Sequence, residues 1–278
     1  MHKLAIFVEG HSELLFVRRL LQEVAGKNNV AIQSQQIFGG RSVPRRAIII
    51  HAAQFAGNER YYILITNCGG DHQVAARIKE DHAKLSASGY TKIIGVRDVR
   101  PDFSILDIPR LERGLRLGVR ADLISVDFVL SVMEIEAWFL SEATHFARIH
   151  PSLTVELIKN SLGFDPSADD MSSRPAPAKD LGDCYQLVGH SYRKGSAVTS
   201  DALDYAECYL TLPPRIPYLR KLVDSLDNFL GSASQTLVKT IIWHGRTSSS
   251  LFAKPVVTSM LGVSGRPQFN CVTNLVLR

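Results

Sequence analysis

An acidic cluster lies close to the N-terminus, directly after an apolar run. Residues 4–8 read LAIFV, and Glu9, Gly10 and Glu13 follow them. In a strand-to-helix connection, Gly10 lets the chain turn and both carboxylates lie at one corner, where they could bind a hard cation such as Mg²⁺. The alternative is that Glu9 only ends a strand and that Glu13 stabilises the positive N-terminus of the following helix.

A second group of charged residues follows the apolar segment 92–96. Asp98 and Arg100 are two residues apart, so an extended chain places them on one face. Asp98 could then act as a metal ligand and Arg100 as a clamp on a phosphate group. The alternative is a plain ion pair between the two side chains at the surface, and the sequence leaves both open.

Two glutamates in the segment MEIEAWFL, Glu134 and Glu136, form a third candidate. In a strand both side chains would face the same way. In a helix they would point about 200° apart, so that only one could reach a shared site. The helical interpretation also places Trp138 and Phe139 inside the protein, and we expect these rings to be buried rather than to stack on bases.

Basic side chains and one histidine could contact phosphate or move protons. His11 could act as a general acid or base, since imidazole titrates near neutrality. Lys194 could offset the charge of a phosphate group. Arg41, Arg45 and Arg46 form a basic run that could contact a nucleic-acid backbone, and such contacts make binding depend on salt. The alternative for this run is the solvated start of a helix.

Apolar runs of strand length alternate with segments of helical spacing in the first half of the chain. We predict strands at residues 4–8, 30–38, 61–66, 92–96 and 123–133. We predict helices at residues 12–25, 44–57, 71–87 and 107–118. Because the strands are largely apolar, the pattern favours an α/β fold with a mainly parallel sheet, covered by helices on both faces. Ser12 is the predicted N-cap of the first helix. Ligands collect at the carboxyl ends of strands in such sheets, where Glu9 and Asp98 lie.

The second half of the chain has a different composition. Residues 165–180 are rich in Pro, Ser and Asp, which indicates an exposed loop, and residues 199–231 are predicted to be partly helical. Beyond Asp227 the chain has five Lys or Arg residues and no acidic residue. Three short β-like runs are predicted near residues 237–243, 254–262 and 269–277. The predicted parts are an α/β domain at residues 1–145, a helical region at 146–231 and a basic, β-containing tail at 232–278.

The composition excludes several classes of protein. Of 278 residues, 45% are hydrophobic and 21% are charged, which argues against wholesale disorder. No apolar run reaches the roughly 18 residues that a membrane-spanning helix needs, and the N-terminus does not resemble a signal peptide. The four cysteines include no CxxC pair, so no zinc site is predicted. We expect a soluble, cytoplasmic protein with no membrane contact, whose net charge of +5 suits a polyanionic partner.

A resemblance to a known family is carried by five pieces of the sequence. The segment IFVEGHSELLFVRRLL resembles the opening of TOPRIM domains, the Mg²⁺-binding module of topoisomerases, primases and OLD-family nucleases. In OLD-type members a second glutamate follows the first by four residues, as Glu13 follows Glu9. Further pieces resemble an uncharacterised TOPRIM-like family often encoded beside ATPases in phage-defence loci: NCGGDHQVAARIKED, GYTKIIGVRDVRP, MEIEAWFLSE, and Tyr192-Arg193-Lys194 with LPPRIPYLRKLVDSL. Together they cover most of residues 4–230.

The chain departs from the TOPRIM pattern at the second acidic site. TOPRIM domains normally carry Asp-x-Asp there, whereas this chain has Asp98 and Arg100. A cation thus stands where the resemblance places a metal ligand. Asp102 could substitute for the missing acid, or Glu136 could complete the ligand shell. Alternatively, the site holds one metal ion or none.

The resemblance implies a Mg²⁺- or Mn²⁺-dependent nuclease, or nuclease subunit, that cleaves nucleic-acid phosphodiesters in anti-phage defence. The implied metal ligands are Glu9, Glu13, Asp98, Asp102 and Glu136. The implied catalytic residues are Glu9 and Asp98, with Arg100 and Lys194 to offset phosphate charge. The alternative is a TOPRIM fold with a degenerate metal site, acting as a binding or regulatory partner of an ATPase. The sequence leaves open whether DNA or RNA is bound and whether the protein is a homo-oligomer.

Overall fold

A six-stranded sheet lies at the centre of the protein. The computed structural model describes residues 1–40, 43–70 and 73–245, and of residues 232–245 only the backbone. The strands are β1 (His2–Val8), β2 (Val30–Phe38), β3 (Arg46–His51), β4 (Tyr61–Asn67), β5 (Lys92–Asp98) and β6 (Ser125–Ser131). Their order is β3-β2-β4-β1-β5-β6, and all neighbouring pairs are parallel except β2 and β3. The predicted α/β fold with a mainly parallel sheet is therefore confirmed.

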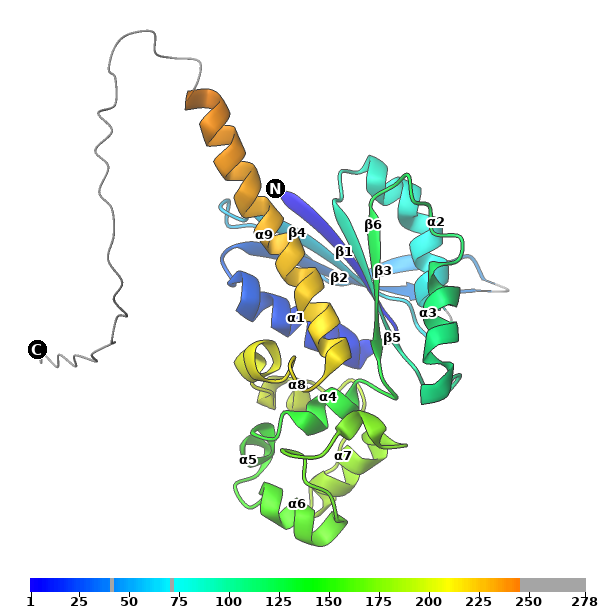
Figure 1. Ribbon diagram of the computed structural model, residues 1–278, viewed down its shortest axis with the longest axis vertical. Coiled ribbons are helices and arrows are strands. Elements are labelled where there is room, and N and C mark those ends of the chain that lie inside the picture. The colour runs from blue at the N-terminus through cyan, green and yellow to red at the C-terminus, as the bar shows by residue number, and fades with distance from the viewer. Residues whose placement is uncertain (41–42, 71–72, 246–278) are drawn as a thin grey trace, which may run out of the picture. The chain divides into compact units, whose positions relative to one another are not determined.

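Helices cover both faces of this sheet (Figure 1). One face carries α1 (His11–Ala25) and the first part of α9 (Pro217–Gly245), and the other carries α2 (Gln73–Ala87) and α3 (Ile108–Arg116). Because side chains alternate along a strand, Leu4 and Ile6 of β1 pack with the α1 layer, and Ala5 and Phe7 pack with the α2 layer. All four are buried, as expected for a central strand of a parallel sheet.

The helical region extends the core on the α1 face. Its helices are α4 (Glu136–Ser141), α5 (His145–Ile149), α6 (Val155–Leu162), α7 (Pro177–Gln186) and α8 (Ala197–Ala202). Short turns are η1 (Ile105–Asp107), η2 (Met171–Ser173) and η3 (Glu207–Thr211). Trp138 and Phe139 of α4 are buried against the ring of Phe16, with centroid distances of 5.7 Å, so their predicted place in the core is confirmed. Residues Met1–Leu237 form one compact unit that contains both the sheet and the helical region.

Three predictions of secondary structure differ from the structure. Residues 44–57 do not form a helix but contain β3, whose run Ile48–Ile49–Ile50 is β-branched and suits an edge strand paired with β2. The predicted loop at residues 165–180 includes η2 and the start of α7. The predicted β-like run at residues 237–243 is wrong, because α9 continues to Gly245. The two later β-like runs lie outside the described residues.

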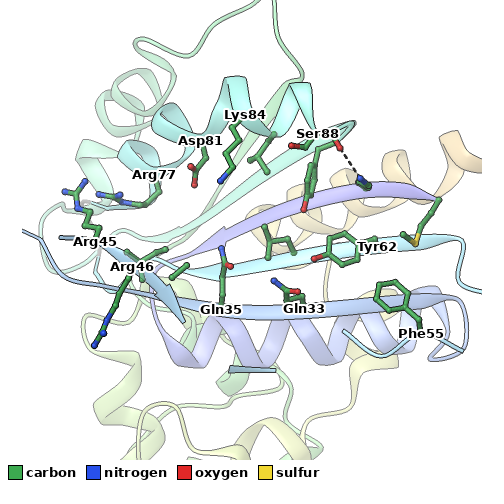
Figure 2. Close-up of a pocket in the computed structure, with 17 residues that line it drawn as sticks. Gln33, Gln35, Arg45, Arg46, Phe55, Tyr62, Arg77, Asp81, Lys84 and Ser88 are labelled. Carbon is green, nitrogen blue, oxygen red and sulfur yellow. Dashed lines mark hydrogen bonds between the residues drawn. The ribbon is translucent and has the colours of Figure 1, made fainter. Parts of the chain in front are cut away.

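A groove lies between α2 and the strands β2, β3 and β4, with a volume of about 720 Å³ (Figure 2). It opens on the sheet face that α2 and α3 cover elsewhere. Among the residues that the structure describes, no helix is both long and apolar enough to cross a bilayer.

Candidate functional site

The carboxyl ends of β1 and β5 are adjacent in the sheet, and they bring two predicted site residues together. Val8 is in register with Val96, so Glu9 and Asp98 follow at the same edge of the sheet. The Oε2 atom of Glu9 accepts a hydrogen bond from the backbone N–H of Asp98 at 3.0 Å. Strand pairing thus produces the acidic corner that was expected from residues far apart in the sequence.

Glu13 comes to the same corner from the first turn of α1. Its Oε2 atom accepts a hydrogen bond from the backbone N–H of Gly10, the N-cap residue, at 2.9 Å. The side chain therefore stabilises the helix start, as the simpler interpretation expects, and also belongs to the acidic cluster. Glu13 is only 5% exposed. Burial, together with repulsion from Glu136, raises the pKa of Glu13 to about 7.

Asp98 and Glu136 are buried acids of the same cluster, 4% and 0% exposed. Burial raises the pKa of Asp98 well above its ordinary value, and the charges of Glu13, Glu9 and Glu136 raise it further. Burial also raises the pKa of Glu136. Among the described residues, Oδ1 of Asp98 and Oε2 of Glu136 have no hydrogen-bond partner. Buried carboxylate oxygens of this kind gain stability when a cation or a donor reaches them.

Lys194 supplies positive charge to the acidic cluster. Its Nζ atom lies 2.8 Å from Oε1 of Glu134 and 3.7 Å from Oε2 of Glu136. Burial alone would lower the pKa of Lys194, but these two carboxylates outweigh burial and raise it above its ordinary value. Only one glutamate was expected to reach the site from a helix. Both do so, because α4 begins at Glu136 and Glu134 lies in the turn before it.

Tyr192 is a member of the cluster whose contact the sequence does not reveal. Its hydroxyl donates a hydrogen bond to Oε1 of Glu136 at 2.5 Å. Burial and the charge of Glu136 raise the pKa of Tyr192, so the phenol stays protonated and acts as a donor. The two residues are 56 positions apart. The signal in the sequence is that Tyr192 lies two residues before Lys194, in one of the pieces that carry the family resemblance.

The loop that carries Lys194 is attached to the start of α1. The backbone N–H of Gly195 donates a hydrogen bond to Oγ of Ser12 at 2.9 Å. Ser12 therefore does not act as the predicted N-cap, a position that Gly10 takes. Gly195 has φ +73°, and a Cβ atom there would come within 3.2 Å of His11. Glycine is required at this position because the backbone is left-handed and close to a neighbouring side chain.

Two predicted site residues make their own contacts outside the cluster. Arg100 points its guanidinium at the backbone carbonyl of Pro175, to which it donates a hydrogen bond. Asp102 forms an ion pair with Arg97 at 2.9 Å. Arg97 precedes Asp98 in β5, so its side chain points to the opposite face of the sheet. Asp102 is therefore not placed to complete a ligand shell. The charge of Arg100 helps to lower the pKa of Glu134, but Lys194 is the cation in direct contact with the carboxylates.

The cluster has the donor chemistry of a metal site without its geometry. Its acids are all carboxylates, the ligands that Mg²⁺ and Mn²⁺ prefer. Within the part of the chain that the structure describes, no three His, Cys, Asp or Glu side chains form a group that could hold a metal ion. The amine of Lys194 is the cation that contacts Glu134 and Glu136 here. Metal binding would therefore require the carboxylates to draw closer together.

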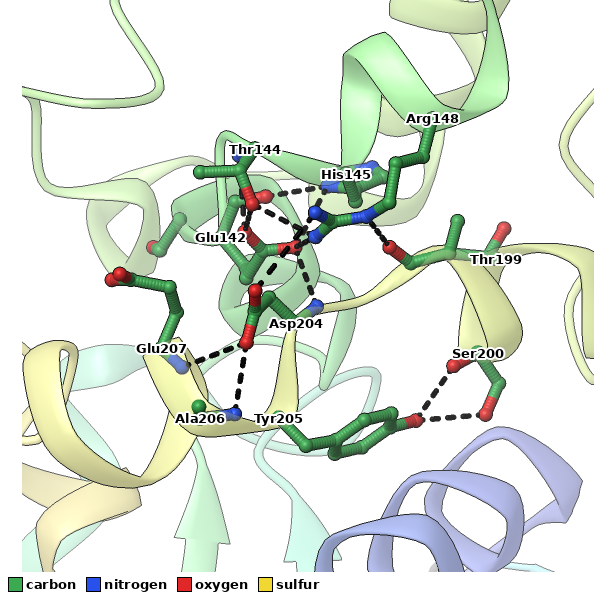
Figure 3. A network of polar contacts seen from close by, with 12 residues as sticks. Glu142, Thr144, His145, Arg148, Thr199, Ser200, Asp204, Tyr205, Ala206 and Glu207 are labelled. Carbon is green, nitrogen blue, oxygen red and sulfur yellow. Dashed lines mark hydrogen bonds and ion pairs between the residues drawn. The ribbon is translucent and has the colours of Figure 1, made fainter. Parts of the chain in front are cut away.

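A second buried polar network, in the helical region, has a different character (Figure 3). Glu142 accepts hydrogen bonds from the backbone N–H of Thr144 at 3.0 Å, from that of Asp204 at 3.1 Å and from Arg148 at 3.3 Å. Both of its carboxylate oxygens thus have donors. His145 is fully buried, and burial lowers its pKa to about 4. This network joins α5 to the segment after α8, and we interpret it as structural.

Among known proteins, this chain has a distant structural neighbour but no matching family model or curated protein. A crystal structure of a hypothetical protein from Pyrococcus horikoshii OT3 is similar with a TM-score of 0.38 and 13% sequence identity, covering 85% of this chain and 100% of that chain. A similarity at this level assigns neither family nor function, so the functional argument depends on the acidic cluster itself.

Proposed function

We propose that this protein is a Mg²⁺- or Mn²⁺-dependent nuclease, or a nuclease subunit, that cleaves phosphodiester bonds at the acidic cluster. The observation that carries the proposal is the gathering of Glu9, Glu13, Asp98 and Glu136 at one edge of the sheet. Three of these carboxylates, Glu13, Asp98 and Glu136, are buried, their charges repel one another, and a divalent cation would stabilise such a group. The resemblance to TOPRIM-like proteins of phage-defence loci supports the same activity and a role in defence.

The residues of the cluster would have distinct roles. Glu9, Glu13 and Asp98 would hold the metal ion, with Glu136 as a further ligand. A bound ion would lower the pKa of a water molecule and stabilise the charge that develops on phosphate. Lys194 would offset the negative charge of the substrate, since its ammonium group already lies over the carboxylates.

Calorimetry with Mn²⁺ tests the metal site directly. We expect binding by the wild type and its loss in Glu9→Gln and in Asp98→Asn, because each substitution removes a charged ligand. Glu23→Gln is the matched control, since Glu23 lies on α1 with a side chain that is 53% exposed and is paired with Lys27. Circular dichroism of each variant establishes that the fold is retained.

Cleavage assays on labelled DNA and RNA test the activity. Glu9→Gln and Asp98→Asn should each abolish metal-dependent cleavage, while Glu23→Gln should cleave like the wild type. Wild-type cleavage by both Glu9→Gln and Asp98→Asn would contradict the proposal.

A second function is favoured by the geometry of the same residues. The described residues include no three-ligand group for a metal, and Lys194 already pairs with Glu134 and Glu136. A cluster in which an amine replaces the metal ion would suit a non-catalytic binding or regulatory protein, such as a partner of an ATPase. If the folded wild-type protein binds no Mn²⁺, the result favours this non-catalytic function over the nuclease. Co-purification with an ATPase encoded beside the protein would then test it.

A further inference from the structure

We propose that the groove between α2 and the strands β2, β3 and β4 binds a single-stranded segment of nucleic acid. The inference rests on the proposed nuclease function and deepens it, since it names the form of the substrate and the surface that holds it. The groove volume of about 720 Å³ is within the range of ligand sites. Its lining residues come from β1, β2, β4 and α2 and from the segment around β3.

One end of the groove carries an aromatic platform. Phe55 is 58% exposed, and its ring lies parallel to that of Tyr62, with a centroid distance of 6.2 Å and an interplanar angle of 7°. Tyr90 meets Tyr62 edge-on at 6.4 Å. A large ring that is held parallel to a second ring and still exposed offers a face on which a base can stack. Such stacking depends little on the identity of the base.

The other end of the groove is basic. Arg45 and Arg77 lie there in Figure 2, at the opposite end from Phe55, and Arg46 borders the same end with its side chain pointing away from α2. Arg45 and Arg46 belong to the basic run in the sequence, whose third member, Arg41, lies outside the described residues. Positive side chains of this kind bind the phosphate backbone.

Not all of these cations are equally available to a ligand. Glu80 pairs with Arg45 at 3.0 Å and with Arg77 at 2.5 Å. Lys84, which projects from α2 above the middle of the groove, is therefore assigned the main phosphate contact. Arg46 is in register with Phe38, and its side chain extends away from α2 at the edge of the groove. Among the lining side chains that the structure describes, Asp81 is the one acid, against five basic residues. The groove is thus electropositive as a whole.

The floor between the two ends carries two amide side chains beside the apolar Leu64. Gln33 and Gln35 of β2 lie there, between the aromatic and the arginine ends (Figure 2). The Nε2 atom of Gln35 donates a hydrogen bond to Oγ1 of Thr66 at 3.0 Å, which orients its amide. Amide side chains offer both a donor and an acceptor, and either can meet the edge of an unpaired base.

The length of the groove indicates a strand rather than a single nucleotide. Tyr62 is in register with Ala31 of β2, and Arg46 is in register with Phe38. The seven residue-to-residue steps from Ala31 to Phe38 span roughly 23 Å. Stacked nucleotides rise about 3.4 Å each, so several are needed to connect the aromatic and basic ends. The strand must be unpaired near Phe55, because a duplex hides the faces of its bases.

Fluorescence anisotropy with the full chain tests this inference. The probes are labelled single-stranded DNA and RNA of about 12 nucleotides and the corresponding duplexes, in EDTA. We expect the single strands to bind more tightly than the duplexes, with an affinity that falls as salt rises. No binding of single strands, or equal binding of duplexes, would overturn the inference.

Substitutions of exposed side chains locate the binding surface without disturbing the core. Phe55→Leu should weaken binding about tenfold through loss of stacking. Lys84→Gln should weaken it severalfold and reduce the slope of log affinity against log salt by about 0.7. The matched controls are Leu106→Ala, at a side chain 91% exposed outside the groove, and Lys79→Gln on α2. Wild-type binding by both groove variants would contradict the proposal.

The failure of this inference and that of the nuclease proposal can be told apart, because binding is measured without metal. Groove-dependent binding with no cleavage in Mn²⁺ would support the groove and overturn the nuclease. Metal-dependent cleavage with unchanged binding by Phe55→Leu and Lys84→Gln would support the nuclease and overturn the groove.

Discussion

The carboxylates of the acidic cluster differ in what stabilises each of them. Glu9 accepts a hydrogen bond from the backbone N–H of Asp98, and Glu13 accepts one from the backbone N–H of Gly10. Glu136 has the phenol of Tyr192 on one oxygen, while its other oxygen has no hydrogen bond within the described chain. The charge of the cluster is therefore only partly compensated by hydrogen bonds, and Lys194 provides the nearby cation.

Replacing Lys194 tests whether its amine competes with a metal ion. In Lys194→Gln the carboxylates lose a competing positive charge, so we expect Mn²⁺ affinity to rise about tenfold in calorimetry. Without metal the variant should lose roughly 1–2 kcal/mol of unfolding free energy, a modest loss because the Lys194 side chain is 54% exposed.

Lys179→Gln is the control for this experiment. Lys179 is 72% exposed and pairs with Asp183 on α7, so both Mn²⁺ affinity and stability should stay at wild-type values. A fall in Mn²⁺ affinity in Lys194→Gln would show that the amine helps to hold the cluster in a binding arrangement.

At the scale of elements, short connections place the acids. The turn from β1 into α1 carries Glu9 and Glu13, and the end of β5 carries Asp98. The loop before α8 brings Lys194 and Tyr192 back to the same corner. Two glycines in these elements allow close approach, one in the loop and one within β5.

Gly195→Ala should destabilise the loop that carries Lys194. The left-handed backbone and the 3.2 Å approach to His11 both oppose a side chain there, and we expect a loss of roughly 2 kcal/mol in chemical unfolding. Gly189→Ala is the control, since Gly189 has φ +76° but no atom within 4 Å of the added Cβ. Equal losses in the two variants would show that His11 moves aside without cost.

Gly95→Ala should disturb the contact between β5 and α2. A Cβ atom at Gly95 would lie 2.7 Å from Cδ1 of Ile78 and 3.0 Å from Cδ1 of Phe128, so we expect a loss of about 1–3 kcal/mol. Ile78→Val removes that Cδ1 atom. The double variant should therefore lose less stability than the sum of the two single variants, and strict additivity in denaturant unfolding would argue against the contact.

At the scale of the whole molecule, the two buried polar networks respond to pH in opposite directions. His145 has a pKa of about 4 when folded, against an ordinary value of 6.5, so the unfolded chain binds its proton first as pH falls. The contribution of His145 to the free energy of unfolding therefore falls as pH drops from 6.5 to about 4. Glu13 has a pKa of about 7 against 4.5, so the folded chain binds its proton first and stability rises as pH falls through that window.

Melting temperatures of two variants at about pH 7 and pH 5 separate these effects. The melting temperature of the wild type should exceed that of His145→Asn by roughly 5 °C less at about pH 5 than at about pH 7. The reason is that only the wild type loses stability through protonation of His145. Relative to Glu13→Gln, the wild type should instead gain stability at the lower pH. A pH-independent difference for either variant would contradict the shift assigned to that residue.

The sequence alone predicts most of the fold, because its strongest signals are local. The run LAIFV becomes β1, and the strand-end positions of Glu9 and Asp98 follow from the apolar runs that precede them. The sequence gives conflicting signals at residues 44–57. Pro44 favours the first turn of a helix, whereas the β-branched residues of β3 favour a strand. Pairing with β2 makes this segment a strand.

By itself, then, the sequence determined the order of strands and helices in the first half of the chain apart from β3, the mainly parallel sheet and the acids at its carboxyl edge. Only the tertiary structure decided which charged groups meet. It turned Arg97 and Asp102 to the opposite face from Asp98, and it placed Lys194 and Tyr192 on Glu136. The physical reason is that periodicity along the chain encodes local conformation and burial, whereas contacts across 56 or more residues arise only when whole elements pack.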